Sequence, residues 1–246
     1  MKLLNRLVIW LNFGVLSLLS FAWYYLMDHE YRKVTAFELD MDRLSNEWSC
    51  VLYRAGGRVL PPIKYNYEYN RFVISGLLHR DINHLLGNAF FHFAFLESVA
   101  HSYSMWDILF VTYYSLLGGN IVSSVYMPNQ ISVGNSGIVF SLIGLLTVER
   151  LYHFKEAKHR LRSILELALI LSLVVLSINP YIDIFNHGYG FVTGLIAGFI
   201  KESYSYRSVL IAKLALLGTP LLHGAYIAAI YGSHADHASA ILDMGC

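Results

Sequence analysis

Two residues of this chain have side chains that could carry out nucleophilic catalysis, and each opens a long apolar run. Ser136 stands between glycines in the stretch VGNSGIVF at 133–140, and His187 begins the stretch HGYGFVTG at 187–194. A serine hydroxyl is a poor nucleophile unless a nearby base takes its proton, and histidine is a common base. The chain can therefore attack a carbonyl group if its fold brings Ser136 and His187 within hydrogen-bonding distance.

A third polar stretch, LHRDINHLLGN at 78–88, supplies hydrogen-bond donors for such a reaction. His84 and Asn88 are four residues apart, so a helix places them on one face. Attack on a carbonyl produces an oxyanion, and donors aimed at this oxygen stabilise the transition state. Two interpretations stay open: His84 and Asn88 act on a reacting group, or they make hydrogen bonds between helices.

The histidine is accompanied by glycines at helical spacing. Gly190 and Gly194 follow His187 along one helical face. Small residues spaced in this way let the backbone of a neighbouring helix approach closely. We therefore expect His187 on the face that packs most tightly. The motif G-x-S-G around Ser136 is by itself also compatible with a serine that caps a helix beside packing glycines.

The composition is that of a membrane protein. Of the 246 residues, 56% are hydrophobic and 14% are charged, and the mean hydropathy is +0.47. Ordinary soluble domains contain about 25% charged residues. The formal net charge is +1 and no basic patch occurs, which argues against a nucleic-acid partner. Cys50 and Cys246 fit neither a metal nor a redox spacing, and two cysteines alone do not predict a disulfide framework.

Seven apolar stretches approach the length of about 20 residues that crosses a bilayer as a helix. We therefore expect an all-α polytopic membrane protein. Its spans are expected at 3–27, 77–100, 106–126, 131–148, 164–182, 184–200 and 209–231. The corresponding parts are the N-terminus and first span at 1–27, a long outer loop at 28–76, a core of spans two to six at 77–200, and a turn, seventh span and tail at 201–246.

The distribution of Lys and Arg indicates the orientation of these spans. The basic loops at 149–162 and 201–207 are expected in the cytoplasm, which puts the N-terminus inside and the C-terminus outside. The loop at 28–76 is also basic, but long segments cross with less regard to charge. Spans two, four and six then all begin near the outer face, so their polar residues share one depth. The fourth span is short, and we expect Ser136 below the surface beside a water-filled cavity.

Together, the three polar stretches resemble the rhomboid family of intramembrane serine proteases. The matching elements are H-x-D-x-x-H-x-x-x-N at 79–88, G-x-S-G-x-x-F at 134–140 and H-x-x-G-x-x-x-G at 187–194. They occur in the family's order and in its second, fourth and sixth core helices. The resemblance implies a rhomboid-like six-helix core with one added C-terminal transmembrane helix, seven spans in all.

The resemblance also implies roles for individual residues. Ser136 corresponds to the nucleophile and His187 to the general base of a Ser-His dyad, while His84 and Asn88 correspond to the side-chain part of the oxyanion site. Further residues at the site are Gly134, Gly137 and Phe140, with Gly190 and Gly194 packing the helices.

Three positions depart from the family's pattern. Only Arg71 matches the Trp-Arg pair that is frequent in the first loop. Phe140 stands where a tyrosine is common, so it can stack on the histidine but cannot donate a hydrogen bond. Asn186 precedes His187 where a small residue is more usual. None of these departures removes a catalytic group.

We therefore expect an intramembrane serine endopeptidase that cleaves single-span membrane proteins near the outer face, with no metal or cofactor. Its partners are a transmembrane protein substrate and the lipid bilayer, and no feature indicates an oligomeric state. The added C-terminal span favours a eukaryotic secretory or plasma membrane over a bacterial inner membrane. One alternative is a catalytically inactive rhomboid-like protein that binds membrane clients. Another is a zinc-dependent seven-span hydrolase, although the eleven histidines include no H-E-x-x-H motif.

Overall fold

The computed structural model describes residues 2–35, 41–154, 160–179 and 182–203. Within these ranges the chain forms nine helices and no β-strand, apart from one isolated bridge between Arg58 and Ser132. The helices are α1 (Lys2–Thr35), α2 (Met41–Arg54), α3 (Leu60–Tyr65), α4 (Arg71–Ile74), α5 (Ile82–Val99), α6 (Met105–Tyr126), α7 (Ser136–Tyr152), α8 (Arg160–Leu176) and α9 (Ile184–Ser203). The described part of the chain is all-α, as predicted.

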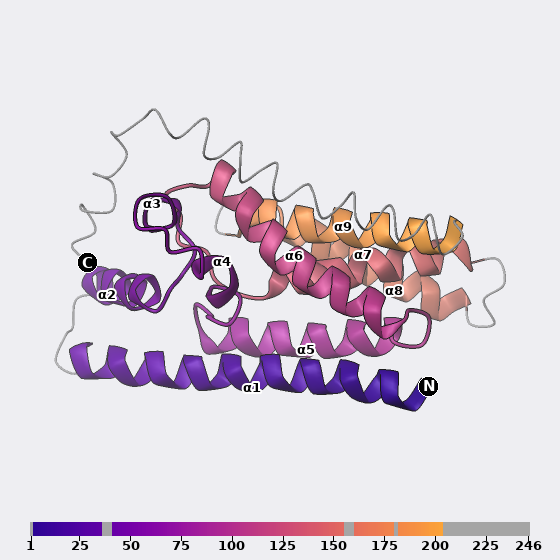
Figure 1. Ribbon diagram of the computed structural model, residues 1–246, viewed down its shortest axis with the longest axis horizontal. Coiled ribbons are helices and arrows are strands. Elements are labelled where there is room, and N and C mark those ends of the chain that lie inside the picture. The colour runs from indigo at the N-terminus through magenta and orange to yellow at the C-terminus, as the bar shows by residue number, and fades with distance from the viewer. Residues whose placement is uncertain (1, 36–40, 155–159, 180–181, 204–246) are drawn as a thin grey trace.

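Helix α7 lies inside the bundle, in contact with α5, α6, α8 and α9 (Figure 1). Every residue from 137 to 146 is buried, and Leu142, Ile143 and Leu145 have no exposed surface. A helix that is apolar on all sides reaches this state only when other helices cover each face. Ser136, the first residue of α7, is therefore held within the bundle and not on an exposed loop.

Glycines bring the backbones of α7 and α9 into direct contact. A methyl group at Gly190 would lie 2.2 Å from the Gly137 carbonyl oxygen, and one at Gly194 would lie 2.0 Å from the Ser141 carbonyl oxygen. Any larger residue at either position would therefore force the two helices apart. This close packing sets the first turn of α9, which carries His187, beside the first turn of α7.

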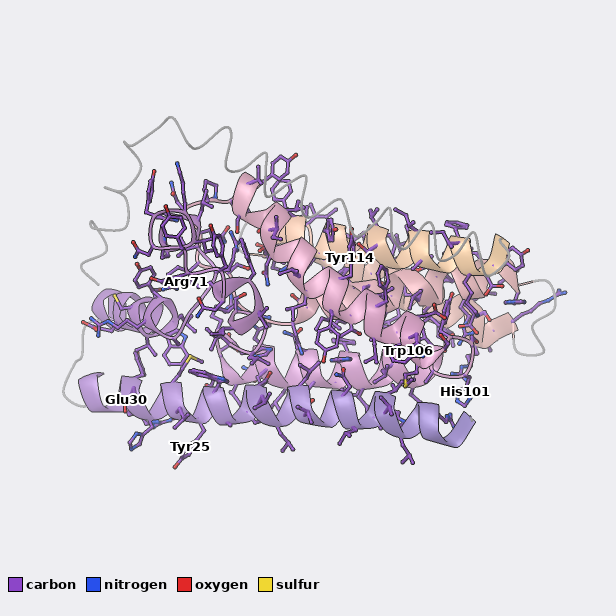
Figure 2. The ribbon with its side chains drawn as sticks, viewed as in Figure 1. Tyr25, Glu30, Arg71, His101, Trp106 and Tyr114 are labelled. Atoms are coloured by element: carbon purple, nitrogen blue, oxygen red, sulfur yellow. The ribbon has the colours of Figure 1, made fainter. Side chains whose placement is uncertain are left out.

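The short helices α2, α3 and α4 gather at the end of the bundle opposite the N-terminus, and we call residues 41–81 the loop end (Figure 1). Its connections are fixed by Arg71, which lies among these helices (Figure 2) and is buried. The Arg71 guanidinium donates to the Tyr53 and Gly57 carbonyl oxygens at 2.7 and 2.8 Å and pairs with Glu68 at 2.7 Å. One arginine thus joins the end of α2 to the segment before α4.

Apolar side chains cover much of the outer surface of α1. Leu11, Leu18 and Tyr25 are each about two-thirds exposed or more, and Tyr25 points away from the bundle (Figure 2). Among the described residues, two helical segments are long and apolar enough to cross a membrane, at Arg6–Arg32 and Met105–Tyr126. A continuous apolar surface of this kind is buried in a bilayer or against a partner.

Several predicted spans differ from the helices in their bounds. The first span was expected to end at 27, but α1 continues to Thr35, and the expected loop at 28–76 contains α2, α3 and α4. The second span was expected from 77, whereas α5 begins at Ile82 because the Asp81 side chain caps it by accepting from the His84 N–H at 2.8 Å. His79 therefore lies before the helix.

The fifth predicted span, 164–182, corresponds to α8, which begins at Arg160 and ends at Leu176. The third, fourth and sixth spans agree with α6, α7 and α9 to within a few residues, except that the segment 131–135 precedes α7 as a loop. The predicted seventh span at 209–231 lies outside the described residues. Cys246 also lies outside the described residues, so the structure does not address a disulfide between Cys50 and Cys246.

Candidate active site

Ser136 and His187 meet at the centre of the bundle's polar region. His187 Nε2 lies 2.6 Å from Ser136 Oγ, a hydrogen bond between the first turn of α9 and the first residue of α7. The Phe140 ring stacks on the His187 ring, with centroids 4.3 Å apart and planes 15° from parallel. Asn135, not Ser136, is the N-cap of α7, so the serine hydroxyl faces the histidine and does not cap the helix.

His84 and Asn88 lie on the face of α5 that is turned toward the serine. Asn88 Nδ2 and His84 Nδ1 are both buried and have no hydrogen-bond partner among the described residues. Gly134 has φ +117°, and a methyl group there would lie 2.8 Å from the His84 ring and 3.3 Å from Asn88 Nδ2. Glycine is therefore required at 134 for two reasons, the backbone conformation and the space that the two side chains occupy.

These four side chains line one cavity of about 410 Å³. Its deeper wall is apolar and comes from α5, α7 and α8, through Phe91, Val139, Phe140, Ile143 and Leu173. The loop end closes one side with Trp48 and Arg80. The Ile138 N–H donates to the Asn135 carbonyl oxygen at 2.9 Å. The N–H groups of Ser136 and Gly137, at the start of α7, have no partner within their helix and carry its positive dipole end. An anion that forms beside Ser136 would thus meet several donors in a region of low dielectric.

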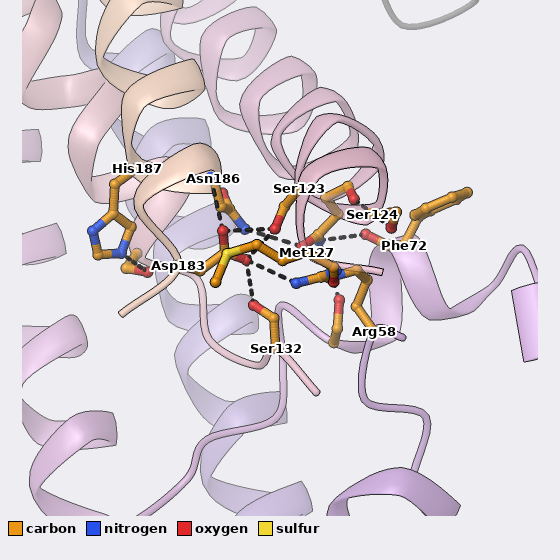
Figure 3. A network of polar contacts seen from close by, with 12 residues as sticks. Arg58, Phe72, Ser123, Ser124, Met127, Ser132, Asp183, Asn186 and His187 are labelled. Carbon is orange, nitrogen blue, oxygen red and sulfur yellow. Dashed lines mark hydrogen bonds and ion pairs between the residues drawn. The ribbon is translucent and has the colours of Figure 1, made fainter. Parts of the chain in front are cut away.

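A second group of polar residues adjoins this cavity and was not found from the sequence (Figure 3). Two of its members, Ser132 and Asp183, also line the cavity. Arg58 Nη2 pairs with Asp183 Oδ2 at 3.1 Å, and the hydroxyls of Ser123 and Ser132 donate to the same carboxylate at 2.6 Å. Burial alone would raise the pKa of the Asp183 carboxyl. The Arg58 charge and these hydroxyl donors outweigh burial, and the pKa lies below its ordinary value. The carboxylate is therefore charged at neutral pH.

Asn186, noted above only as a departure from the family's pattern, has a packing role. A methyl group at Gly119 would lie 2.5 Å from Asn186 Oδ1, and one at Gly137 would lie 2.0 Å from it. The carboxamide therefore occupies a slot that the two glycines leave between α6 and α7. Its Nδ2 donates to Asn120 Oδ1 at 3.0 Å, and Asn120 Nδ2 donates to the Phe72 carbonyl oxygen at 2.8 Å.

The part of the chain that the structure describes contains no set of ligands for the zinc ion of the alternative hydrolase. No three His, Cys, Asp or Glu residues come close enough there to hold a metal ion.

A family model for the Rhomboid domain matches residues 66–203 of this chain, more than half of its length. The chain belongs to the rhomboid family. As a rhomboid it is a membrane protein, and the matched region contains Ser136, His187, His84 and Asn88.

Individual relatives of this rhomboid differ in what their names say about activity. RHOMBOID-like protein 6, mitochondrial, of Arabidopsis thaliana is 30% identical over 62% of this chain and 50% of its own length. RHOMBOID-like protein 1 of the same plant is 26% identical over 64% of this chain and 42% of its own length. Inactive rhomboid protein 2 of Homo sapiens is 26% identical over 67% of this chain and 20% of its own length. The matches thus span half or less of these relatives, and family membership alone leaves protease activity open.

Proposed function

We propose that this rhomboid is an intramembrane serine protease with Ser136 as nucleophile and His187 as general base. The observation that carries the proposal is the 2.6 Å contact between Ser136 Oγ and His187 Nε2, which lies in a cavity of about 410 Å³. A serine and a histidine in this geometry form the pair that nucleophilic catalysis requires.

In the proposed reaction, Ser136 Oγ attacks a peptide carbonyl carbon while its proton passes to His187 Nε2. The resulting oxyanion accepts hydrogen bonds from Asn88 Nδ2, from the His84 ring and from the backbone N–H of Ser136. When the C–N bond breaks, His187 gives the proton to the leaving amine. Water then enters the cavity, gives a proton to His187 and attacks the acyl carbon. The bond from that carbon to Ser136 Oγ breaks, and His187 returns the proton to Ser136 Oγ.

His187 is proposed to act with Ser136 as a dyad, without a carboxylate that orients its ring. For Nε2 to accept the serine proton, Nδ1 must carry the hydrogen of the neutral ring. His187 Nδ1 has no hydrogen-bond partner among the described residues, and Asp183 is occupied by Arg58 and two serines. The ring is instead supported by stacking on Phe140, a contact that does not need the hydroxyl of a tyrosine.

We also propose the membrane arrangement in which this site would act. The core has six spans and a seventh follows at 209–231, with the N-terminus in the cytoplasm and the C-terminus on the outer or lumenal side of a eukaryotic secretory or plasma membrane. In this arrangement the chain is divided into the N-terminus with the first span at 1–27, the outer loop at 28–76, the core spans at 77–200 and the C-terminal part at 201–246. The loop end then faces outward, and the substrate is a transmembrane protein whose helix unwinds where it enters the cavity.

A rhomboid without protease activity, which binds membrane clients, is the second candidate because relatives with "inactive" in their names match this chain. The contact between Ser136 and His187 favours the protease, since client binding requires neither a nucleophile nor a base. The two candidates differ in whether substrate peptide bonds are cut.

The test is co-expression with a panel of tagged single-span membrane proteins, comparing wild type with Ser136→Ala and His187→Ala. We expect cleavage of at least one substrate by the wild type and by neither variant, with equal expression of all three. A fluorophosphonate probe should label the wild type and not Ser136→Ala. Cleavage that persists in Ser136→Ala would show that the nucleophile is a different residue.

A further inference from the structure

The buried pair Arg58–Asp183 lies between the segments that carry Ser136 and His187. The Arg58 side chain is fully buried and that of Asp183 is 11% exposed. Two buried charges cost several kcal/mol of desolvation per ion, and their attraction offsets this only when the geometry is good and further hydrogen bonds are made. Such a pair contributes little to stability, so its presence calls for another explanation.

Arg58 makes hydrogen bonds to two segments, the one that leads to Ser136 and the one that leads to His187. Its backbone N–H donates to the Ser132 carbonyl oxygen at 3.0 Å, and its own carbonyl oxygen accepts from the Ser132 N–H at 2.9 Å. Ser132 lies four residues before Ser136. The Arg58 side chain reaches Asp183, which lies four residues before His187. The same arginine thus contacts the approach to the nucleophile through its backbone and the approach to the base through its guanidinium.

Asp183 in turn fixes the beginning of α9. Its carboxylate accepts from the Asn186 N–H at 3.0 Å, and its carbonyl oxygen accepts from the His187 N–H at 3.1 Å. The Ser132 hydroxyl donates to the same carboxylate, so the two approach segments also touch directly. The first turn of α9 is therefore anchored at a point that α6 and the loop end share (Figure 3).

We propose that Arg58 and Asp183 are positioning residues that hold His187 Nε2 within reach of Ser136 Oγ. The inference rests on the proposed function, because it concerns the geometry of that dyad. Neither residue touches the reacting atoms. They act through the two segments that they join, and displacement of a catalytic group by about 1 Å can cost roughly 10²-fold in rate. The consequence is that the loop between α2 and α3 takes part in setting the rate of a reaction that occurs on α7.

The first experiment compares wild type, Arg58→Met, Asp183→Asn and the double variant, purified as the full chain in detergent. A transmembrane peptide that the wild type cleaves is the substrate, and a fluorophosphonate reports the reactivity of Ser136. The double variant leaves no unpaired charge, so it keeps the test valid where a single variant fails to fold. We expect its kcat and its labelling rate to fall together by about tenfold or more, with KM changed less than about twofold.

A matched control is the ion pair Arg150–Glu166, which joins α7 to α8 far along α7 from Ser136. The double variant Arg150→Met with Glu166→Gln should leave kcat and labelling within about twofold of wild type, whatever its effect on the unfolding temperature. If the Arg58→Met/Asp183→Asn variant folds and both rates per folded molecule equal those of wild type, the pair is only structural and the inference is wrong.

A smaller change offers a second matched comparison. Ser123 Oγ donates to Asp183, whereas its buried neighbour Ser124 donates to the Asn120 carbonyl oxygen within its own helix. Ser123→Ala should lower kcat several-fold and Ser124→Ala should not. Equal kcat in the two variants would overturn the inference even if both Arg58 variants failed to fold.

Wild type and Ser136→Ala in the same assays separate this inference from the proposed function. Cleavage that is lost in Ser136→Ala keeps the proposed function, whatever the Arg58 variants do. Wild-type protein that neither cleaves nor takes up the probe overturns both.

Discussion

The cavity and the Arg58–Asp183 cluster are neighbouring groups of buried polar residues, but their hydrogen bonding differs. In the cavity, Asn88 Nδ2, His84 Nδ1 and His187 Nδ1 have no partner among the described residues. In the cluster, both oxygens of Asp183 accept hydrogen bonds, from Arg58, Ser123, Ser132 and the Asn186 backbone, although Arg58 Nε and Asn186 Oδ1 have no partner among the described residues.

The difference separates two uses of a buried polar group. Leaving a buried donor without a partner costs roughly 1–3 kcal/mol, and a donor that lines a cavity, as Asn88 Nδ2 does, is placed to bond a group that enters the cavity. A fully bonded carboxylate has no capacity left for a substrate and instead fixes the segments around it. Substitutions in the cavity should therefore change the reaction directly, with little change in stability. Substitutions among the bonded residues should change the reaction only by moving the segments that those residues hold.

The largest effect is expected at the dyad. Ser136→Ala or His187→Ala should lower kcat by roughly 10⁴-fold or more, because either change removes proton transfer from the nucleophile. Thermal unfolding in detergent should change little, since the bond between the two side chains is partly solvent-facing through the cavity. A variant that lost activity only in proportion to lost folded protein would contradict this distinction.

Asn88→Ala should come next, with a fall in kcat of about 10²-fold and little change in KM. Asn88 Nδ2 has no bond to lose, so the unfolding temperature should stay near that of the wild type. Steady-state kinetics on a transmembrane peptide and thermal unfolding of the same preparation measure both quantities. An unchanged kcat would make Asn88 an interhelical contact residue, the alternative considered from the sequence.

Asn120→Ala is the matched variant among the bonded residues. Asn120 Nδ2 donates to the Phe72 carbonyl oxygen and to Ser75 Oγ, and Asn120 Oδ1 accepts from Asn186. Its loss leaves buried groups without partners, so the free energy of unfolding should fall by about 1–3 kcal/mol. In the same two assays, Asn120→Ala should lose less kcat than Asn88→Ala. A larger loss of kcat in Asn120→Ala would show that the cavity and the bonded residues do not differ in this way.

The smallest effect is expected at Phe140, which touches the base without bonding to it. A stacked aromatic pair contributes about 0.5–1.5 kcal/mol beyond the burial of its area. Phe140→Leu should therefore lower kcat by roughly threefold to tenfold, while Phe140→Tyr keeps the stack and should stay near wild type. Equal loss in both variants would indicate that packing volume at 140, and not the ring contact, supports His187.

The sequence singled out residues that line the cavity in the structure, but not the residues that hold them in place. Ser136, His187, His84 and Asn88 could be assigned to one depth because they occur in motifs at the starts of apolar runs, and span order alone relates those starts. Their roles stay predictions. Gly190 and Gly194 were expected on the tight face from their spacing, and both now lie against α7 backbone.

The supporting residues could not be found in this way. Arg58 and Asp183 are 125 residues apart and belong to no periodic pattern, so only the folded chain relates them. Asn186 was noted as unusual, but its partner Asn120 lies in the middle of an apolar helix and carries no local signal. The predicted start of the second span at 77 differs from the start of α5 for another reason. Apolar residues precede Asp81, but the helix begins only after Asp81, which caps it.

The backbone contacts at Gly190 and Gly194 have a consequence for how such a protein can diversify. Because main-chain atoms set the separation of α7 and α9, the apolar side chains that α5 and α8 contribute to the cavity wall do not set it. Positions such as Phe91 and Leu173 can change size without moving His187 relative to Ser136. In the proposed protease, substrate preference and bond cleavage would thus be encoded at separate positions, so that one could change while the other stays intact.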